Sequence, residues 1–212
     1  MITLYHCADA RSFRALWALH EIGLDYDLKL LAFPPRFQDR GYLDINPLGT
    51  VPFLIDGAAT MSESAAIVEY LIARHAPDLL GVAVADADFA AYLNWLHFGE
   101  ATLTFPQTLV LRYTRLEPTR GLEVVAQDYA RWFLVRLRHV ERALTDGRAY
   151  LLGDRFTGAD ISVGYALLLA SQLKLDDGFE PLTRAYWQRL TDRPAYRAAR
   201  AAQKGTPGPT AF

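Results

Sequence analysis

The sequence predicts a small mixed α/β domain followed by an all-helical domain. Strand and helix periods alternate over the first eighty residues, whereas no convincing strand pattern appears after Asp86. Between the two regions, residues 79–85 contain Gly, Ala and Val with few charges, which is typical of a linker. We therefore expect one domain at residues 1–78 and a second at residues 86–212, joined by the segment 79–85.

The first domain is predicted to run in the order β-α-β-α-β-β-α. Residues 2–6 form the first expected strand, and the apolar residues of 12–22 have helical spacing. Residues 26–30 alternate apolar and polar side chains, as a half-buried strand does. After a loop or short helix, a hairpin over 53–61 and a helix over 64–74 complete the domain.

The turn before the hairpin is the most informative segment of the chain. It reads Asn46-Pro47-Leu48-Gly49-Thr50-Val51-Pro52, with prolines that fix φ and a glycine that permits a positive φ. A cis bond between Val51 and Pro52 would turn the Val51 peptide outward. Its N–H and C=O could then pair with an extended ligand as an added β-strand does.

An acidic residue and a hydroxyl follow this hairpin. Glu63 and Ser64 stand at the predicted N-terminus of the next helix, where backbone N–H groups favour polar and anionic ligands. They could hold a ligand there. Alternatively, the serine is only a helix cap and Glu63 only a partner of the helix dipole.

Four helical patterns fill the second domain, at about 87–115, 121–145, 158–173 and 182–202. Thr157 is predicted to cap the third of these helices, with Asp160 reaching back to it. Phe156 is expected to pack against Ile161 as a hydrophobic staple. We interpret this helix start as structural.

With these motifs in this order, the chain resembles the cytosolic glutathione transferases over essentially its whole length. The resemblance rests on the Asn-Pro-x-Gly-x-Val-Pro turn, the Glu-Ser pair and the Phe-Thr-x-Ala-Asp-Ile helix start. It implies a thioredoxin-like first domain that binds glutathione, an electrophile pocket lined by the second domain, and a homodimer. It also implies that Val51 pairs with the cysteinyl backbone of glutathione, while Glu63 and Ser64 hold its γ-glutamyl end.

Composition and charge argue against other classes of function. The 212 residues carry a net charge of −2 with both signs interspersed, which gives nucleic-acid binding no electrostatic support. The start has no signal-peptide pattern, no apolar run is long enough to span a bilayer, and one cysteine excludes an internal disulfide. We therefore expect a cytoplasmic protein. The five histidines show no metal-ligand spacing, so we expect no metal.

Activation of the glutathione thiol sets the chemical requirement of such a site. Lowering a thiol pKa from ~8.5 to ~6.5 takes roughly 2.7 kcal/mol of preferential stabilisation of the thiolate. A helix N-terminus supplies ~0.3–1 kcal/mol, so a charge-assisted hydrogen bond of ~1.5–3 kcal/mol must close the gap. Because the nucleophilicity of a thiolate falls as its pKa falls, the net gain in reaction rate is only about threefold. Most of the acceleration must come from holding the electrophile beside the sulfur.

The donor to the thiolate is where the sequence departs from the family. Members place a Tyr, Ser or Cys after the first strand or in the first turn of the next helix, but Asp9, Ala10 and Arg11 stand there. Ser12 is the nearest hydroxyl and either donates to the thiolate or only caps the helix. Arg11 either stabilises the thiolate with its permanent charge or is a solvated surface residue.

Cys7 offers a third route, because a mixed disulfide with glutathione would make the protein a thiol-transferase. It directly follows the first strand, however, and is expected to be buried. We therefore rank Ser12 and Arg11 above Cys7 as catalytic residues.

The sequence also departs from the family at the position that binds the glycine end of glutathione. Many relatives carry a lysine near the Val-Pro turn that meets the glycine carboxylate, but Leu48 and Thr50 occupy the candidate positions. Arg36 or Arg40 could substitute from the preceding segment. We include Thr50 and Arg36 among the expected glutathione-binding residues.

An aromatic stripe along the 87–115 helix supplies the candidates for an apolar electrophile pocket, which are Phe98, Thr102, Phe105 and Tyr113. Most of the stripe is expected to be core or dimer interface. His97 and Glu100 are polar groups on the same helix and are expected at the pocket or across the dimer.

Two classes of function follow. The first is a transferase that conjugates glutathione to an apolar electrophile, or a related glutathione-dependent dehalogenase, etherase, isomerase or thiol-transferase. The second is a non-catalytic binding or interaction module on the same fold, suggested by the missing hydroxyl. The retained Val51-Pro52 and Glu63-Ser64 pairs favour the enzyme.

Overall fold

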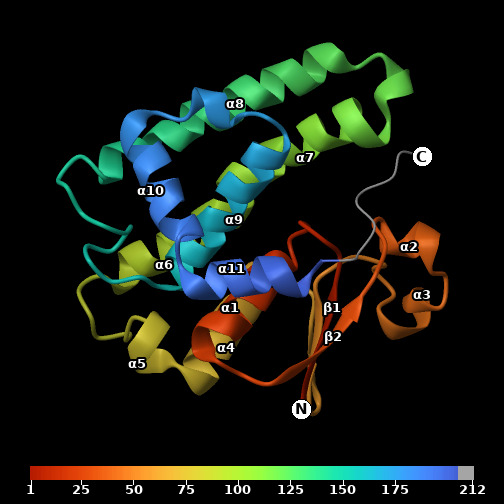
Figure 1. The fold of residues 1–212 in the computed structure, drawn as a ribbon, viewed down its shortest axis with the longest axis horizontal. Coiled ribbons are helices and arrows are strands. Elements are labelled where there is room, and N and C mark those ends of the chain that lie inside the picture. The colour runs from red at the N-terminus through yellow and green to blue at the C-terminus, as the bar shows by residue number, and fades with distance from the viewer. Residues whose placement is uncertain (205–212) are drawn as a thin grey trace.

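The computed structural model describes residues 1–204, and its first part is a four-stranded mixed sheet with helices packed against it (Figure 1). The strands are β1 (Ile2–His6), β2 (Tyr26–Leu30), β3 (Phe53–Asp56) and β4 (Ala59–Met61), in the order β2-β1-β3-β4. β1 pairs with β2 in parallel and with β3 antiparallel, so Leu4 lies opposite both Leu28 and Leu54. The four predicted strands are confirmed.

Two helices cover this sheet, and both were predicted. α1 (Phe13–Ile22) and α4 (Ser64–His75) pack against each other. Leu16 of α1 and Leu71 of α4 are fully buried together with Leu4 and Leu54 of the sheet. Short helices α2 (Pro35–Gln38) and α3 (Tyr42–Ile45) fill the segment between β2 and β3. This order of elements is the thioredoxin-like first domain that the sequence predicts.

The second part of the chain is helical (Figure 1). Its elements are α6 (Phe89–His97), η1 (Phe98–Thr104), α7 (Phe105–Leu111), η2 (Arg112–Leu116), η3 (Pro118–Arg120), α8 (Glu123–Ala143), α9 (Gly158–Gln172), η4 (Asp176–Gly178), α10 (Pro181–Thr191) and α11 (Pro194–Ala202). The helix expected at 87–115 is one run in which η1 and η2 are π-helical stretches. Before this run, α5 (Pro77–Leu80) overlaps the start of the predicted linker, and the domain boundaries stay a prediction.

The expectation of a single helix at 182–202 was wrong. The helix is interrupted between α10 and α11, where Arg193 adopts an extended conformation with φ −63° and ψ 132°. Pro194 explains the break, because it has no backbone N–H and disfavours the helical conformation in the residue before it.

Helix α9 is the centre of the second domain, and every residue from Gly158 to Ala170 is buried. The predicted capping box is confirmed: Thr157 accepts a hydrogen bond from the Ala159 N–H, and the Asp160 carboxylate accepts one of 2.8 Å from the Thr157 N–H. η1 approaches α9 closely at Gly99. A Cβ at this position would lie 2.5 Å from the Ser162 hydroxyl, so only glycine permits the contact.

Arg14 of α1 joins the two domains. Its side chain is completely buried, and its guanidinium lies 4.4 Å from the centre of the Tyr165 ring. Its hydrogen-bond partners are the carbonyls of Gly99 and Ser162, the hydroxyls of Ser64 and Thr104, and the carboxylate of Glu100. Burial lowers the pKa of the guanidinium, and the adjacent Glu100 carboxylate opposes this shift.

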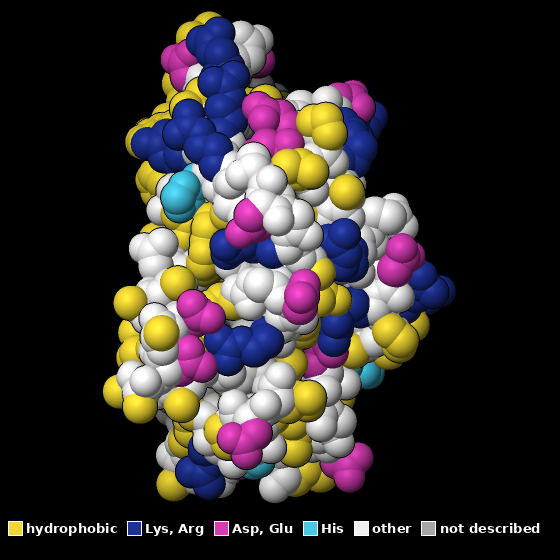
Figure 2. Space-filling view, turned by 90° about the vertical axis from the view of Figure 1, so that its left-hand side faces the viewer, with side chains coloured by type: hydrophobic (Ala, Val, Ile, Leu, Met, Phe, Trp, Pro, Cys, Tyr) yellow, Lys and Arg dark blue, Asp and Glu magenta, His cyan; other side chains and the backbone are white. Residues whose placement is uncertain are grey.

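Charges of both signs are interspersed over much of the face shown in Figure 2, as the sequence predicts, although basic side chains gather at its upper end. None of the helices within residues 1–204 is long and apolar enough to cross a membrane.

We predict that Arg14→Met lowers the free energy of unfolding by about 3–5 kcal/mol, because it removes the buried cation that pairs with the Glu100 carboxylate and donates to the carbonyls of Gly99 and Ser162. Urea denaturation followed by circular dichroism measures the change. Arg131→Met on α8 is the matched control, because the Arg131 side chain is 74% exposed, and its effect should stay within about 0.5 kcal/mol. A loss below about 1 kcal/mol in Arg14→Met would contradict the prediction.

Candidate functional site

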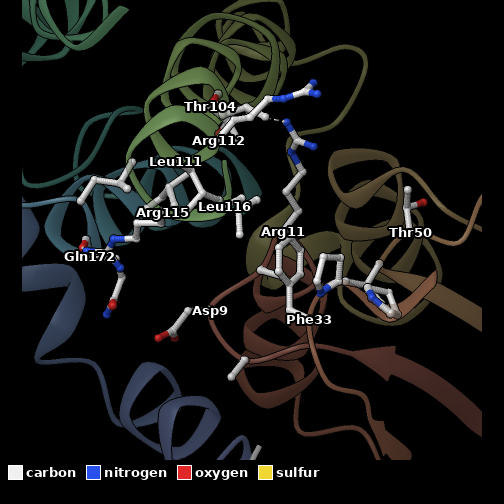
Figure 3. Close-up of a pocket in the computed structure, with 18 of the residues that line it drawn as sticks. Asp9, Arg11, Phe33, Thr50, Thr104, Leu111, Arg112, Arg115, Leu116 and Gln172 are labelled. Atoms are coloured by element: carbon white, nitrogen blue, oxygen red, sulfur yellow. Dashed lines mark hydrogen bonds between the residues drawn. The ribbon is translucent and has the colours of Figure 1, made fainter. Parts of the chain in front are cut away.

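A cavity of about 320 Å³ lies between the two domains (Figure 3). The first domain lines it with three loop segments: residues 8–11 after β1, residues 33–36 before and at the start of α2, and residues 49–51 before β3. The second domain lines it with residues of η1, α7, η2 and α9. Candidate residues Arg11, Arg36, Thr50 and Val51 are among these lining residues.

The turn before β3 is fixed by contacts that present Val51 to the cavity. Gly49 has a φ of +61°, and a Cβ there would lie 2.6 Å from the Cβ of Arg36. The carbonyl of Thr50 accepts hydrogen bonds from the Tyr42 hydroxyl at 2.7 Å and from the Asn46 amide at 2.8 Å.

The Val51-Pro52 bond is cis. Within residues 1–204, the Val51 peptide takes part in no turn or sheet hydrogen bond. The turn therefore offers a backbone donor and a backbone acceptor beside the cavity.

Helix α11 holds the loop that follows β1. Asp9 in this loop has a φ of +57°, a conformation that residues other than glycine rarely adopt. Its carboxylate forms an ion pair with Arg200 and accepts a hydrogen bond of 2.5 Å from the Gln203 amide. Neither partner was predicted from the sequence, because both lie more than 190 residues from Asp9 and no local pattern marks them.

Arg11 projects from the same loop into the cavity (Figure 3). Its Nε lies 2.8 Å from Oε1 of Glu100, and its Nη2 donates to the Thr108 hydroxyl at 3.0 Å. Nη1 has no acceptor among the described residues. Since Glu100 also pairs with Arg14, two guanidinium groups share one carboxylate. The arrangement leaves positive charge at the cavity and is suited to hold an anion.

Glu100 does not line the cavity itself, but it pairs with Arg11, which does. His97 on the preceding turn is exposed and does not line the cavity.

Ser12 is not placed to contact a ligand, which contradicts its expected role as the thiolate donor. Its side chain is fully buried, and its hydroxyl accepts a hydrogen bond from the Cys7 N–H at 3.3 Å and donates to the Cys7 carbonyl at 3.4 Å. It does not cap α1 either, because its backbone is already helical, with φ −61° and ψ −15°. Its hydroxyl closes the turn between β1 and α1 instead.

Cys7 is fully buried, as predicted. Its thiol lies 3.7 Å from the Ala32 carbonyl, and burial raises the pKa of Cys7 to about 12. The thiol therefore stays protonated at neutral pH, which removes the basis for a thiol-transferase that uses Cys7.

The two residues at the start of α4 differ in exposure. The Ser64 side chain is buried, and its hydroxyl is engaged by Arg14 at 3.1 Å and by Glu100 at 3.4 Å. Glu63 is exposed, caps no N–H of the helix, and has no ion-pair partner among the described residues. Neither residue lines the cavity, but Glu100 connects the helix start to Arg11.

The expected electrophile pocket lies on the wrong face of its helix. Phe98 packs against Trp95 and His139, with ring centroids 5.2 and 5.4 Å away, and the Phe105 ring is 6.3 Å from that of Tyr129. Thr102 and Tyr113 do not line the cavity either.

Other residues of the same helical run line the cavity instead. They are Thr104, Thr108 and Leu111 on η1 and α7. Thr104 and Leu111 lie two positions from Thr102 and Tyr113, which corresponds to about 200° around an α-helix, so these pairs face in opposite directions.

The cavity wall from the second domain combines apolar and charged groups. It consists of Thr104, Thr108, Leu111, Arg112, Arg115, Leu116, Glu117, Tyr165, Leu169, Gln172 and Leu173. Within residues 1–204, no cluster of three His, Cys, Asp or Glu side chains is arranged to hold a metal ion.

Comparison with known proteins finds relatives along the whole chain. Residues 10–74 match the family model described as "Glutathione S-transferase, N-terminal domain". The chain is 32% identical to glutathione S-transferase 4 of Zea mays over 86% of its own length and 83% of the relative. It is 26% identical to glutathione S-transferase 3 of Schizosaccharomyces pombe, over 94% and 86% of the two chains. Among solved structures, a glutathione transferase of Methylococcus capsulatus is 27% identical, with a TM-score of 0.81 over 96% and 98% of the two chains.

Proposed function

Because the chain belongs to the glutathione S-transferase family and is a glutathione transferase, we propose that it binds glutathione along the first-domain wall of the cavity and stabilises the thiolate with Arg11. The observation that carries this proposal is the placement of the Arg11 guanidinium in the wall, ion-paired to a carboxylate that a second arginine already neutralises.

The first-domain wall suits an extended peptide with charged ends. The Val51 peptide pairs with the cysteinyl backbone, and Arg36 and Thr50 meet the glycine carboxylate. The free carboxylate of Glu63 binds the γ-glutamyl ammonium, and the first N–H groups of α4 bind the γ-glutamyl carboxylate. The Ser64 hydroxyl is occupied by Arg14, so Ser64 contributes its backbone N–H to this contact.

Arg11 supplies the stabilisation of the thiolate that a helix dipole alone cannot provide. A charge-assisted hydrogen bond contributes ~1.5–3 kcal/mol, close to the ~2.7 kcal/mol needed to lower a thiol pKa by two units. Glu100 and Thr108 fix the guanidinium, so the second domain orients the donor. The sulfur then attacks the electrophilic atom, the bond to the leaving group breaks with its electron pair, and the thiol proton passes to solvent.

The second domain holds the electrophile beside the sulfur. Leu111, Leu116, Leu169 and Leu173 give its wall an apolar floor that can bury a hydrophobic carbon skeleton. Positioning of this kind supplies most of the rate acceleration, because the lower thiol pKa contributes only about threefold.

A homodimer also belongs to this proposal. The outer faces of α7 and α8 expose large apolar side chains, with Phe105 51%, Val135 58% and Trp132 38% exposed. Tyr129 lies between the two exposed aromatic rings, 6.3 Å from Phe105 and 4.9 Å from Trp132. An apolar face of this kind is suited to a second copy of the chain. A cytoplasmic location stays a prediction.

We predict that Glu63→Ala weakens glutathione binding at least tenfold, about 1.5 kcal/mol, because the ligand ammonium loses a charged acceptor. Isothermal titration calorimetry with glutathione measures the effect. Glu69→Ala on the same helix is the matched control and should bind as the wild type does. Unchanged affinity in Glu63→Ala would remove this part of the binding mode.

We predict that Arg11→Ala raises the pKa of the bound thiol by about one to two units, because the thiolate loses its charged donor. The ultraviolet absorbance of the thiolate, titrated against pH with saturating glutathione, reports this pKa. Ser12→Ala should leave the pKa unchanged and lower stability by about 1 kcal/mol, since only the hydrogen bonds to Cys7 are lost. Cys7→Ser should remain active. A pKa shift confined to the Ser12 variant would assign the role to Ser12 instead.

We predict that light scattering at micromolar concentration reports a mass of two 23.8 kDa chains. Placing charges on the apolar face, as in Phe105→Glu combined with Trp132→Glu, should shift the population toward the single chain. A wild-type protein of single-chain mass would rule out the dimer.

A further inference from the structure

The second-domain wall of the cavity carries an arginine, Arg115, that no carboxylate within residues 1–204 neutralises. Arg112 and Arg115 both line this wall, but they differ in their partners. Arg112 lies 2.8 Å from Glu117, which also accepts a hydrogen bond of 3.0 Å from Arg120. Arg115 donates to the backbone carbonyl of Gln172, and no carboxylate among residues 1–204 lies within 4.0 Å of it. Its positive charge is therefore available to a ligand.

This charge stands beside an apolar surface. Leu116 follows Arg115 directly in the chain, and Leu173 follows Gln172, whose carbonyl Arg115 contacts. Both leucines line the cavity. A ligand that fills this part of the cavity thus meets a hydrocarbon floor and, at its edge, a guanidinium that matches a carboxylate in geometry.

Glutathione does not account for Arg115. In Figure 3, Arg115 and Gln172 lie on the opposite side of the cavity from Thr50, with Arg11 between them. The Thr50 side is the wall along which glutathione lies in the proposed function. A glutathione molecule on that wall leaves the Arg115 side to the second substrate.

We propose that the second substrate is an amphiphilic electrophile with a carboxylate, and that Arg115 binds this carboxylate while the neighbouring leucines hold the carbon skeleton. This inference rests on the proposed function and adds the class of substrate. For an aryl halide of this class, a bond forms between the glutathione sulfur and the ring carbon. The carbon–halogen bond breaks with its electron pair on the halide, and the thiol proton passes to solvent.

The test compares an acid with its neutral ester. Calorimetric titrations use 3-nitrobenzoate and methyl 3-nitrobenzoate in the presence of saturating glutathione, and neither compound has a reactive leaving group. The wild type should prefer the acid. Arg115→Gln should reduce the ratio of acid affinity to ester affinity 10- to 100-fold, and Arg115→Lys should retain part of the preference.

Two further variants sharpen the result. Glu117→Gln removes the negative charge beside Arg112 and should raise the preference for the acid severalfold. Arg131→Gln removes an exposed arginine of α8 that lies outside this cavity, and it should keep the wild-type ratio.

The inference is overturned if Arg115→Gln weakens the acid and the ester by the same factor. It is also overturned if this substitution weakens the binding of glutathione and not the binding of the acid, because Arg115 would then belong to the glutathione site. Conjugation of 4-chloro-3-nitrobenzoate and of its methyl ester tests the proposed function separately. If both compounds are conjugated without a preference for the acid, only the inference about Arg115 is wrong. If the acid is preferred through Arg115 but neither compound is conjugated, only the proposed function is wrong.

Discussion

The buried guanidinium of Arg14 is the constraint on which the rest of the molecule depends. A charge moved out of water is costly unless every one of its donors finds a partner, and Arg14 satisfies its donors with groups from α4, η1 and α9 at once. Those partners belong to both domains. Any sliding of one domain against the other would leave a buried charge unpaired, so this side chain helps to fix the geometry of the cavity between them.

The same network links fold and chemistry through Glu100. One oxygen of this carboxylate pairs with Arg14 in the core, and the other lies 2.8 Å from Arg11 at the cavity. Glu100 thus both stabilises the buried Arg14 and orients Arg11 at the cavity. In the proposed function, the Arg11 guanidinium, supported from the second domain, takes the role of the hydroxyl that other members carry after the first strand.

Local patterns could be predicted from the sequence, and features set by distant packing could not. The strands and the cap at Thr157 depend on neighbouring residues, and both were predicted correctly. The interruption of the helix before Pro194 also depends on neighbouring residues, but the long helical pattern over 182–202 favoured a single helix there.

The site itself depends on information that spacing does not carry. The aromatic stripe at 98–105 shows which residues share a helix face, but not which face turns toward the cavity. The burial of Ser12 and the contacts of Asp9 with α11 are decided by tertiary packing, across separations that no local motif spans. Glu100 was singled out because a charged residue on an aromatic helix is unusual.

The contact between α11 and the loop after β1 also constrains the order in which the protein is completed. Asp9 leaves the ribosome before Arg200, which follows 191 residues later. Translation proceeds at about 5–20 residues per second, so the loop waits roughly ten to forty seconds for the partners that fix it. The loop after β1 can make these contacts only when α11 docks, so this part of the candidate site is completed only after Arg200 and Gln203 have been translated.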